Sequence, residues 1–201
     1  ADVLVFAETS NAIHGDINIP LSKRPVLHDK DWVEFGNRVT EIGDATLAEG
    51  VRLVYHHHMG TIVQSEEDIH NFMRVTGPSV HLLLDTGHAT WGGADPATLA
   101  GRYKDRISHV HTKDIRSDIM KKAADKNMSF LEAVIAGVYT VPGDGLIDFV
   151  ATLKELKGYS GWVIVEAEQY SDQISALAFA KLGHKNLTNY LTQAGLIEQA
   201  A

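Results

Sequence analysis

The chain has 201 residues, 44% of them hydrophobic and 22% charged, which is typical of one soluble globular domain with a large core. Its formal net charge of −8 argues against nucleic acid as the main partner, because proteins that bind phosphate backbones usually carry a basic face. It has no cysteine, which excludes disulfides, thiolate metal sites and cysteine nucleophiles.

No apolar run approaches the length of a membrane span, and the first residues lack a basic-then-apolar signal pattern. We therefore expect a single domain over residues 1–201, located in the cytoplasm and without a membrane partner. The composition leaves the oligomeric state open, a homo-oligomer included.

Five apolar runs predict strands, and they alternate with helical patterns. In chain order these runs are residues 3–7, 51–55, 80–85, 107–111 and 161–165. After the first strand, Asp31 and Glu34 have the spacing of a helix cap and predict a helix that ends at Gly50. Its predicted apolar stripe is Trp32, Phe35, Val39, Ile42 and Leu47.

Later helices also carry capping signals. Ser65 with Asp68 predicts one helix start, and Asp95 and Asp148 predict two more. Residues 86–87 are expected to turn the chain, and residues 113–139 show no clear period apart from a short helix near 130–135. The last helix is predicted from about Asp172, with an apolar face of Ile174, Leu177, Ala178 and Leu182.

Alternating strands and helices predict a parallel sheet with helical crossovers. No strand is followed by the G-x-G-x-x-G spacing of a dinucleotide site. The pattern therefore favours an α/β fold of the (β/α) barrel type. A closed eight-stranded barrel takes about 250 residues, so five strands predict an incomplete barrel, prone to aggregate and poorly active on its own.

Polar residues follow the predicted strands: Glu8, the histidines 56–58, Asp85 with His88, His111, and Glu166 with Glu168. Ligands bind at the carboxyl ends of parallel strands, and side chains alternate along each strand. We therefore expect Asp85, His111 and Glu166 to converge. Carboxylates with imidazole and no thiolate suit Mn²⁺, Co²⁺, Mg²⁺ or Zn²⁺.

The alternative is that each of these residues has a separate structural role. Asp85 would then cap the following turn, and His88 would be a surface histidine. A separate structural role is plausible for any one of these residues. Three strands that end in Asp85, His111 and Glu166 together favour a shared site.

Five stretches of the chain resemble the inosose dehydratases, which belong to the xylose-isomerase-like group of TIM barrels. They are Y-H-H-H-M-G-T-I-V-Q (55–64), L-D-T-G-H (84–88), H-V-H-T-K-D-I-R (109–116), T-V-P-G-D-G-L-I-D-F (140–149) and G-W-V-I-V-E-A-E-Q (161–169). The resemblance covers nearly the whole chain and implies a TIM (β/α)8 barrel, of which this chain would hold the C-terminal five βα units. The first three units would be missing.

The resemblance also implies a metal site. The wider group binds a divalent metal through a glutamate, an aspartate, a histidine and a second glutamate, and Asp85, His111 and Glu166 match the last three. A histidine cluster stands in place of the first glutamate. His56 or His58, which share one strand face, would fill that place, with Gln64 as the weaker choice. His57 would point away and tolerate change.

The implied reaction is loss of water from 2-keto-myo-inositol, a small polyol ketone, to give a cyclic diketone in inositol catabolism. It needs a base for an α-proton and an acid for the departing hydroxide. Glu166, His56 or His58 would be the base, and His88 and Lys113 would act as acid or orient the substrate. The family implies Mn²⁺ or Co²⁺ and glutathione as cofactors, although no residue pattern here marks a glutathione site.

Three other functions are weighed against this one. An epimerase or isomerase of the same barrel group would need the strand-end glutamate that this chain lacks. A non-catalytic sugar-binding module would not require the complete set of Asp85, His111 and Glu166. A DNA-repair enzyme of the same barrel class conflicts with the acidic net charge.

Overall fold

The computed structural model describes residues 1–170 and 175–198. Five parallel strands form one sheet in the order β1-β2-β3-β4-β7, which confirms the predicted strand count. Their bounds are Val3–Phe6 (β1), Arg52–His56 (β2), Val80–Asp85 (β3), Ile107–Thr112 (β4) and Trp162–Val165 (β7). Within the described residues β1 pairs only with β2 and β7 only with β4, so the sheet is an open half-barrel.

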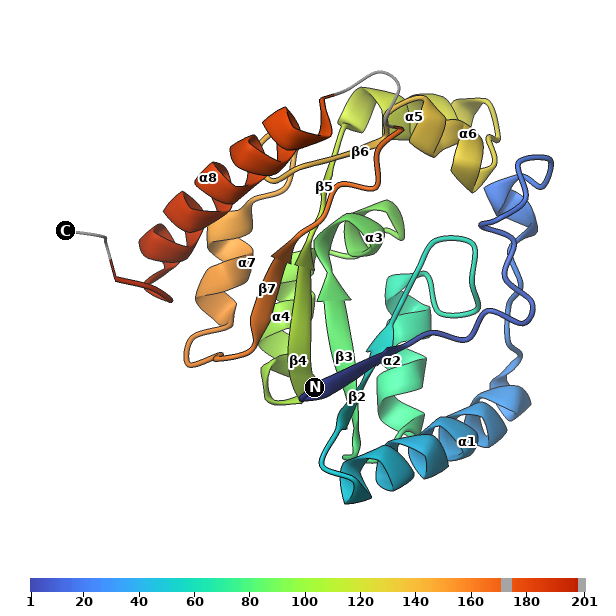
Figure 1. Ribbon diagram of the computed structural model, residues 1–201. Coiled ribbons are helices and arrows are strands. Elements are labelled where there is room, and N and C mark those ends of the chain that lie inside the picture. Colours follow the sequence, from blue (N-terminus) through green and yellow to red (C-terminus); the bar gives the residue numbers. More distant parts are fainter. Residues whose placement is uncertain (171–174, 199–201) are drawn as a thin grey trace.

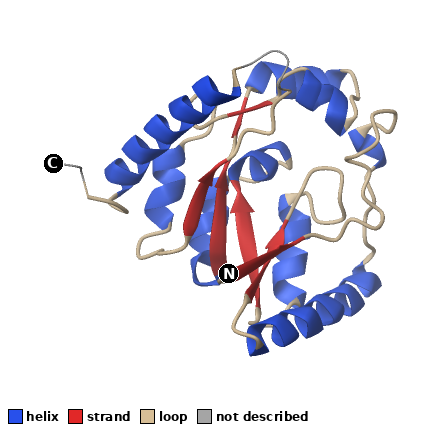
Figure 2. Ribbon diagram, in the orientation of Figure 1, coloured by secondary structure: helices blue, strands red, loops and turns tan. Residues whose placement is uncertain are grey.

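Helices connect the strands, and most of them cover the outer face of the sheet (Figure 1; Figure 2). They are α1 (Asp29–Ala48), α2 (Glu66–Val75), α3 (Thr86–Trp91), α4 (Pro96–Tyr103), α5 (Ser117–Asp125), α6 (Phe130–Ile135), α7 (Phe149–Glu155) and α8 (Ala176–Ala194), with short 3-10 turns at Leu21–Lys23 and Lys104–Arg106. The strand ends point toward α3, α5 and α6 (Figure 1). No helix in the described part of the chain is both long and apolar enough to cross a membrane.

The core lies between the outer face of the sheet and these helices. Tyr55 of β2 packs against Phe72 of α2 with ring centroids 4.1 Å apart, and Leu82 and Leu84 of β3 are fully buried beside them. Burying each large apolar side chain contributes about 1.5–3 kcal/mol. This core fixes the strands relative to one another, and the polar residues meet at their carboxyl ends.

The start of α1 differs from the prediction. The helix begins at Asp29 after His28, and no side chain caps it, so Asp31 and Glu34 form no capping box. Ile42 and Leu47 are each 38% exposed, and the buried positions include Gly36 and Gly43 instead. The reason is close packing: a Cβ on Gly36 would come within 3 Å of Val75.

The last helix also packs differently. It begins at Ala176 within the described residues, while Asp172 and Ile174 lie outside them. Leu177 is 66% exposed, and Ala178 and Leu182 are exposed as well. The helix contacts the sheet through Gly183, where an added Cβ would lie 2.7 Å from Val165. A search for large apolar residues misses a contact made by glycine.

Two helices and one pair of strands were not predicted. Residues 86–87 begin the short helix α3 rather than a simple turn, and α5 lies in the stretch without a clear period. β5 (Asp114–Ile115) and β6 (Tyr139–Thr140) form a separate antiparallel pair. Asp114 holds this region together, because its carboxylate accepts backbone N–H bonds from Gly143, Gly145 and Ile147. The P-G-D-G motif therefore has a structural role.

Candidate metal and active site

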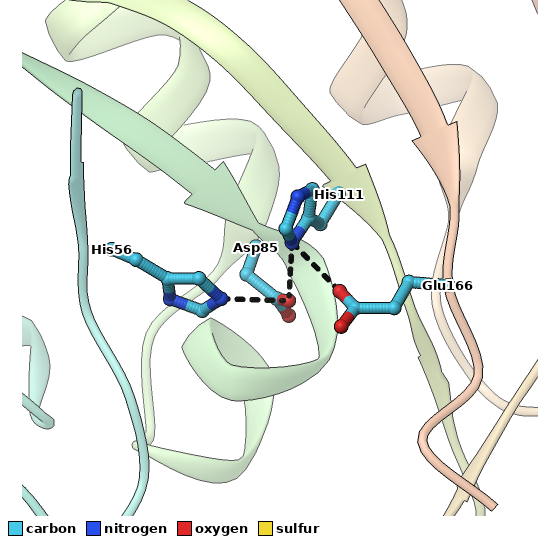
Figure 3. Close-up of side chains that lie close together, drawn as sticks. All are labelled: His56, Asp85, His111 and Glu166. Carbon is cyan, nitrogen blue, oxygen red and sulfur yellow. Dashed lines mark ion pairs between the residues drawn. The ribbon is translucent and has the colours of Figure 1, made fainter. Parts of the chain in front are cut away.

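Four side chains meet at the carboxyl ends of the strands: His56, Asp85, His111 and Glu166 (Figure 3). One ligand atom of each lies within 4.8 Å of the others. Asp85 Oδ2 is 3.8 Å from His56 Nε2 and 3.6 Å from His111 Nδ1. His111 Nδ1 is 2.7 Å from Glu166 Oε2. We call these four residues the rim group.

Strand register explains why they meet. Asp85 pairs with His111 across β3 and β4, and His111 pairs with Ile164, two residues before Glu166. Since side chains on neighbouring strands that pair in register point to the same face, all three side chains enter the barrel interior. His56 ends β2 beside Leu83, two residues before Asp85. The sequence pattern placed each of them at a strand end.

Backbone contacts orient two of the four side chains that could bind a metal, those of His56 and Asp85. His56 Nδ1 lies 2.5 Å from the carbonyl oxygen of His57. A carbonyl only accepts, so Nδ1 carries the proton and Nε2 keeps its lone pair toward Asp85. Asp85 Oδ1 accepts the N–H of His88 at 2.8 Å, which caps α3 and leaves Oδ2 facing the rim group. The cap therefore does not prevent this carboxylate from offering its other oxygen as a metal ligand.

The chemistry of the donor set fits a divalent cation. Asp85 Oδ2, His111 Nδ1 and Glu166 Oε2 are buried and make no well-aligned hydrogen bond among the described residues, although the last two atoms lie 2.7 Å apart. Unsatisfied buried donors and acceptors are costly, and converging carboxylates repel one another unless a positive charge lies between them. Two imidazole nitrogens with two carboxylates suit a transition metal ion such as Mn²⁺, Co²⁺ or Zn²⁺.

Burial and charge set the protonation of the rim group. Burial lowers the pKa of His56 well below its usual value, against the pull of Asp85, so this imidazole is neutral as a metal ligand must be. Burial alone would raise the pKa of Asp85, but the Lys113 ammonium holds it well below the usual range. Burial would lower the pKa of His111, yet the carboxylates of Asp85 and Glu166 raise it to about 9. A proton and a metal ion therefore compete for His111 Nδ1.

A second set of side chains lies beside the rim group. Ligand atoms of His58, His88 and Glu168 also lie within 4.8 Å of one another. The fully buried His88 ring lies against the His58 ring, with ring centroids 3.8 Å apart and the ring planes tilted by 39°. Lys113 Nζ lies between His88 and Glu168, 3.0 Å from His88 Nε2 and 2.7 Å from Glu168 Oε2. We call His58, His88 and Glu168 the inner group.

Three further residues border this inner group. Tyr139 is fully buried, and its hydroxyl lies 2.8 Å from His88 Nδ1. Phe130 of α6 stacks on Trp91 and on His88, and His14 lies 4.9 Å from the His58 ring. Tyr139, Phe130 and His14 come from segments without a strand-end signal, so the sequence patterns missed them.

Other expected positions have different roles. β2 ends at His56, so strand alternation does not extend to His58, which joins the inner group instead of the rim group. His57 points away from the rim group, but it is fully buried and its Nε2 accepts the N–H of Asp85 at 3.3 Å. Gln64 lies outside both groups, and its Oε1 accepts the N–H of Gly60.

Comparison with known proteins gives matches over most of the chain. Residues 3–189 match the family described as xylose isomerase-like TIM barrel. The rhizopine catabolism protein MocC of Rhizobium meliloti is 44% identical over 194 residues, which are 96% of this chain and 60% of MocC. An inosose dehydratase of Geobacillus thermodenitrificans is 44% identical over 173 residues, 84% of this chain and 58% of that protein.

Solved structures show the same fold at lower identity. A xylose isomerase domain protein from Alicyclobacillus acidocaldarius has a TM-score of 0.65 at 20% identity, covering 96% of this chain and 65% of that one. The IOLI protein, whose crystal structure contains a bound zinc atom, has a TM-score of 0.65 at 19% identity, covering 98% and 65%. The chain thus spans about 60% of the length of the curated relatives it matches.

Proposed function

Because this chain belongs to the xylose isomerase-like TIM barrel family, we propose that it carries the metal-binding half of a hydro-lyase that dehydrates 2-keto-myo-inositol to a cyclic diketone. The observation that carries the proposal is the rim group, in which four metal-ligand atoms converge beside a buried lysine. The relatives named inosose dehydratase, at 40–44% identity, support the choice of substrate.

In this proposal His56, Asp85, His111 and Glu166 hold one Mn²⁺ or Co²⁺ ion. The bound ion would act as a Lewis acid on the ketone and so stabilise the negative charge that develops when an α-proton leaves. Glutathione is not part of the proposal, and comparing turnover with and without it tests the expectation raised by the family resemblance.

Glu166 is the base we propose. Its side chain is 33% exposed at the rim, where a substrate can reach it, and its two oxygens face different neighbours, His111 and Lys113. His58 is the weaker candidate because burial lowers its pKa to about 3, which leaves the imidazole neutral but a poor proton acceptor.

Lys113 is the proton donor we propose for the departing hydroxyl group. Burial alone would lower its pKa, but the carboxylates of Asp85, Glu168 and Glu166 raise it, so the side chain is an ammonium at neutral pH. The α C–H bond breaks toward the base, a C=C bond forms, and the β C–O bond breaks as the hydroxyl leaves as water. The resulting enol tautomerises to the diketone. Glu168 orients Lys113, because its Oε2 accepts a hydrogen bond from the ammonium at 2.7 Å, and His88 Nε2 lies 3.0 Å from the same Nζ.

The test is incubation of the protein with 2-keto-myo-inositol and Mn²⁺, with product absorbance and mass followed over time. We expect loss of one water, no turnover after chelation, and a large loss of activity in Glu166→Gln. Glu49→Gln, which changes the exposed residue just after α1, should match the wild type. A product of unchanged mass would identify an epimerase or isomerase. Binding without turnover would identify a sugar-binding module.

A further inference from the structure

The inner group has the composition of a second metal site but already surrounds a cation. His58, His88 and Glu168 offer two imidazoles and a carboxylate within 4.8 Å of one another. The Lys113 ammonium lies among them, 2.7 Å from Glu168 Oε2 and 3.0 Å from His88 Nε2. Its side chain is 1% exposed, so water does not compete for these contacts.

The position of Lys113 relative to the rim group is that of a second ion. Its Nζ is 3.6 Å from Asp85 Oδ2 and 3.5 Å from Glu166 Oε1, two acids of the rim group. The ions of two-metal sites lie about 3.5–4 Å apart, so a second ion would lie next to the acids that hold the first, as the ammonium does here. A metal in the inner group would therefore need the space that the ammonium occupies.

The fold makes room for this lysine. A Cβ on Gly87 would lie 2.8–3.1 Å from the Cγ, Cβ and Cδ atoms of Lys113, so the lysine stem runs directly over the glycine. Lys113 Nζ also lies 4.7 Å from the centre of the Tyr139 ring, which favours a cation there. The ammonium is held on several sides and is not free to swing away.

The charges of the two groups also match a single metal ion. Asp85, Glu166 and Glu168 carry three negative charges, and Lys113 supplies one positive charge. One divalent ion in the rim group neutralises the remainder. A second divalent ion beside the lysine would leave two excess positive charges in a buried site, against one if the lysine were absent, and each uncompensated buried charge is strongly unfavourable.

We propose that Lys113 is a built-in cation that occupies the second metal position of this site and so limits the protein to one metal ion. The inference rests on the metal site of the proposed function, but not on its substrate. If the lysine were removed, the inner group would bind a second divalent transition metal ion.

The experiment compares Mn²⁺ stoichiometry in the full wild-type chain, Lys113→Ala and Lys121→Ala, the last a matched control at an exposed lysine of α5. Metal analysis after desalting from excess Mn²⁺ should give one ion per chain in wild type and Lys121→Ala, and two in Lys113→Ala. Electron paramagnetic resonance should show an isolated Mn²⁺ in the first two proteins and an exchange-coupled pair in Lys113→Ala. Adding Glu168→Gln to Lys113→Ala should restore one ion.

Two ions in wild type, or one ion in a folded Lys113→Ala protein, would overturn the inference. If Lys113→Ala does not fold, the wild type decides alone, because one ion at saturating Mn²⁺ supports the inference and two ions overturn it. Absence of any bound ion would overturn both this inference and the proposed metal site. One ion without turnover of 2-keto-myo-inositol would reject the proposed reaction and leave this inference standing.

Discussion

The backbone N–H of His88 donates a 2.8 Å hydrogen bond to Oδ1 of Asp85, while Oδ2 of the same carboxylate faces the rim group without a hydrogen-bond partner among the described residues. Asp85 thus caps a helix and offers a metal ligand at the same time. The two functions can be separated, because an asparagine oxygen still caps a helix but carries no charge.

Asp85→Asn should therefore weaken metal binding by about 100-fold or more while changing the free energy of unfolding of the metal-free protein little. Isothermal titration with Mn²⁺ and thermal unfolding after chelation measure the two effects. The control is Asp95→Asn, because Asp95 caps α4 through Thr98 outside both groups. Equal Mn²⁺ affinity in Asp85→Asn and wild type would remove Asp85 from the ligand set.

The three consecutive histidines should respond differently to alanine. His56→Ala should lose metal, since it removes a member of the rim group. His58→Ala should keep the metal. His57→Ala should keep the ligand atoms but cost about 1–3 kcal/mol of stability, because it leaves the N–H of Asp85 without its buried acceptor.

Metal content and urea unfolding of the three histidine variants, compared side by side, check this order. If His57→Ala loses metal at unchanged stability while His56→Ala retains it, the assignment of the ligand on β2 is wrong.

Gly87→Ala should destabilise the protein by about 1–3 kcal/mol, because the new methyl group would overlap the stem of Lys113. Gly15→Ala is the matched control, since a Cβ there meets no atom within 4 Å. Chemical denaturation of both variants gives the comparison. A Gly87→Ala protein as stable as Gly15→Ala would show that the lysine is free to move aside.

Protonation of His81 should destabilise the folded protein at low pH. His81 is the second residue of β3 and lies away from the carboxyl ends of the strands. Burial, with help from Arg52 and Arg106, lowers the pKa of His81 from 6.5 to about 4. The folded state therefore favours the neutral ring, and stability is lost as the pH falls from about 6.5 to about 4. His81→Gln, which can still bond Ser108, should lose less stability over this range. Urea unfolding of the metal-free wild type and His81→Gln at several pH values gives the free energy of unfolding of each. An identical dependence on pH in the two proteins would contradict the prediction.

Strand-end chemistry was predictable because the period of a strand and the geometry of a parallel sheet leave little freedom. Asp85, His111 and Glu166 come together through register alone. Glu168 lies beyond the end of β7 and has a left-handed φ of 34°, so strand alternation does not explain its place in the inner group. Side chains delivered by irregular segments were not predictable, as with Tyr139 on a two-residue strand and His14 in the loop before α1.

Helix packing was harder to predict where glycine makes the contact. Patterns of large apolar residues pointed to Ile42 and Leu182, both of which are exposed. The close approaches run through Gly36 and Gly183, where the absence of a side chain lets a helix contact Val75 and Val165 directly. Hydrophobic periodicity does not register such contacts, so it correctly placed Trp32 and Val39 on the buried face of α1 but missed the glycines that complete the contact.

The central claim is that the rim group binds one divalent metal ion, and anomalous X-ray diffraction from crystals grown with Mn²⁺ tests it most directly. We expect one anomalous peak, which marks a Mn²⁺ ion bonded to His56 Nε2, Asp85 Oδ2, His111 Nδ1 and Glu166. A peak elsewhere, or no peak at saturating Mn²⁺ with these four side chains ordered, would contradict the claim.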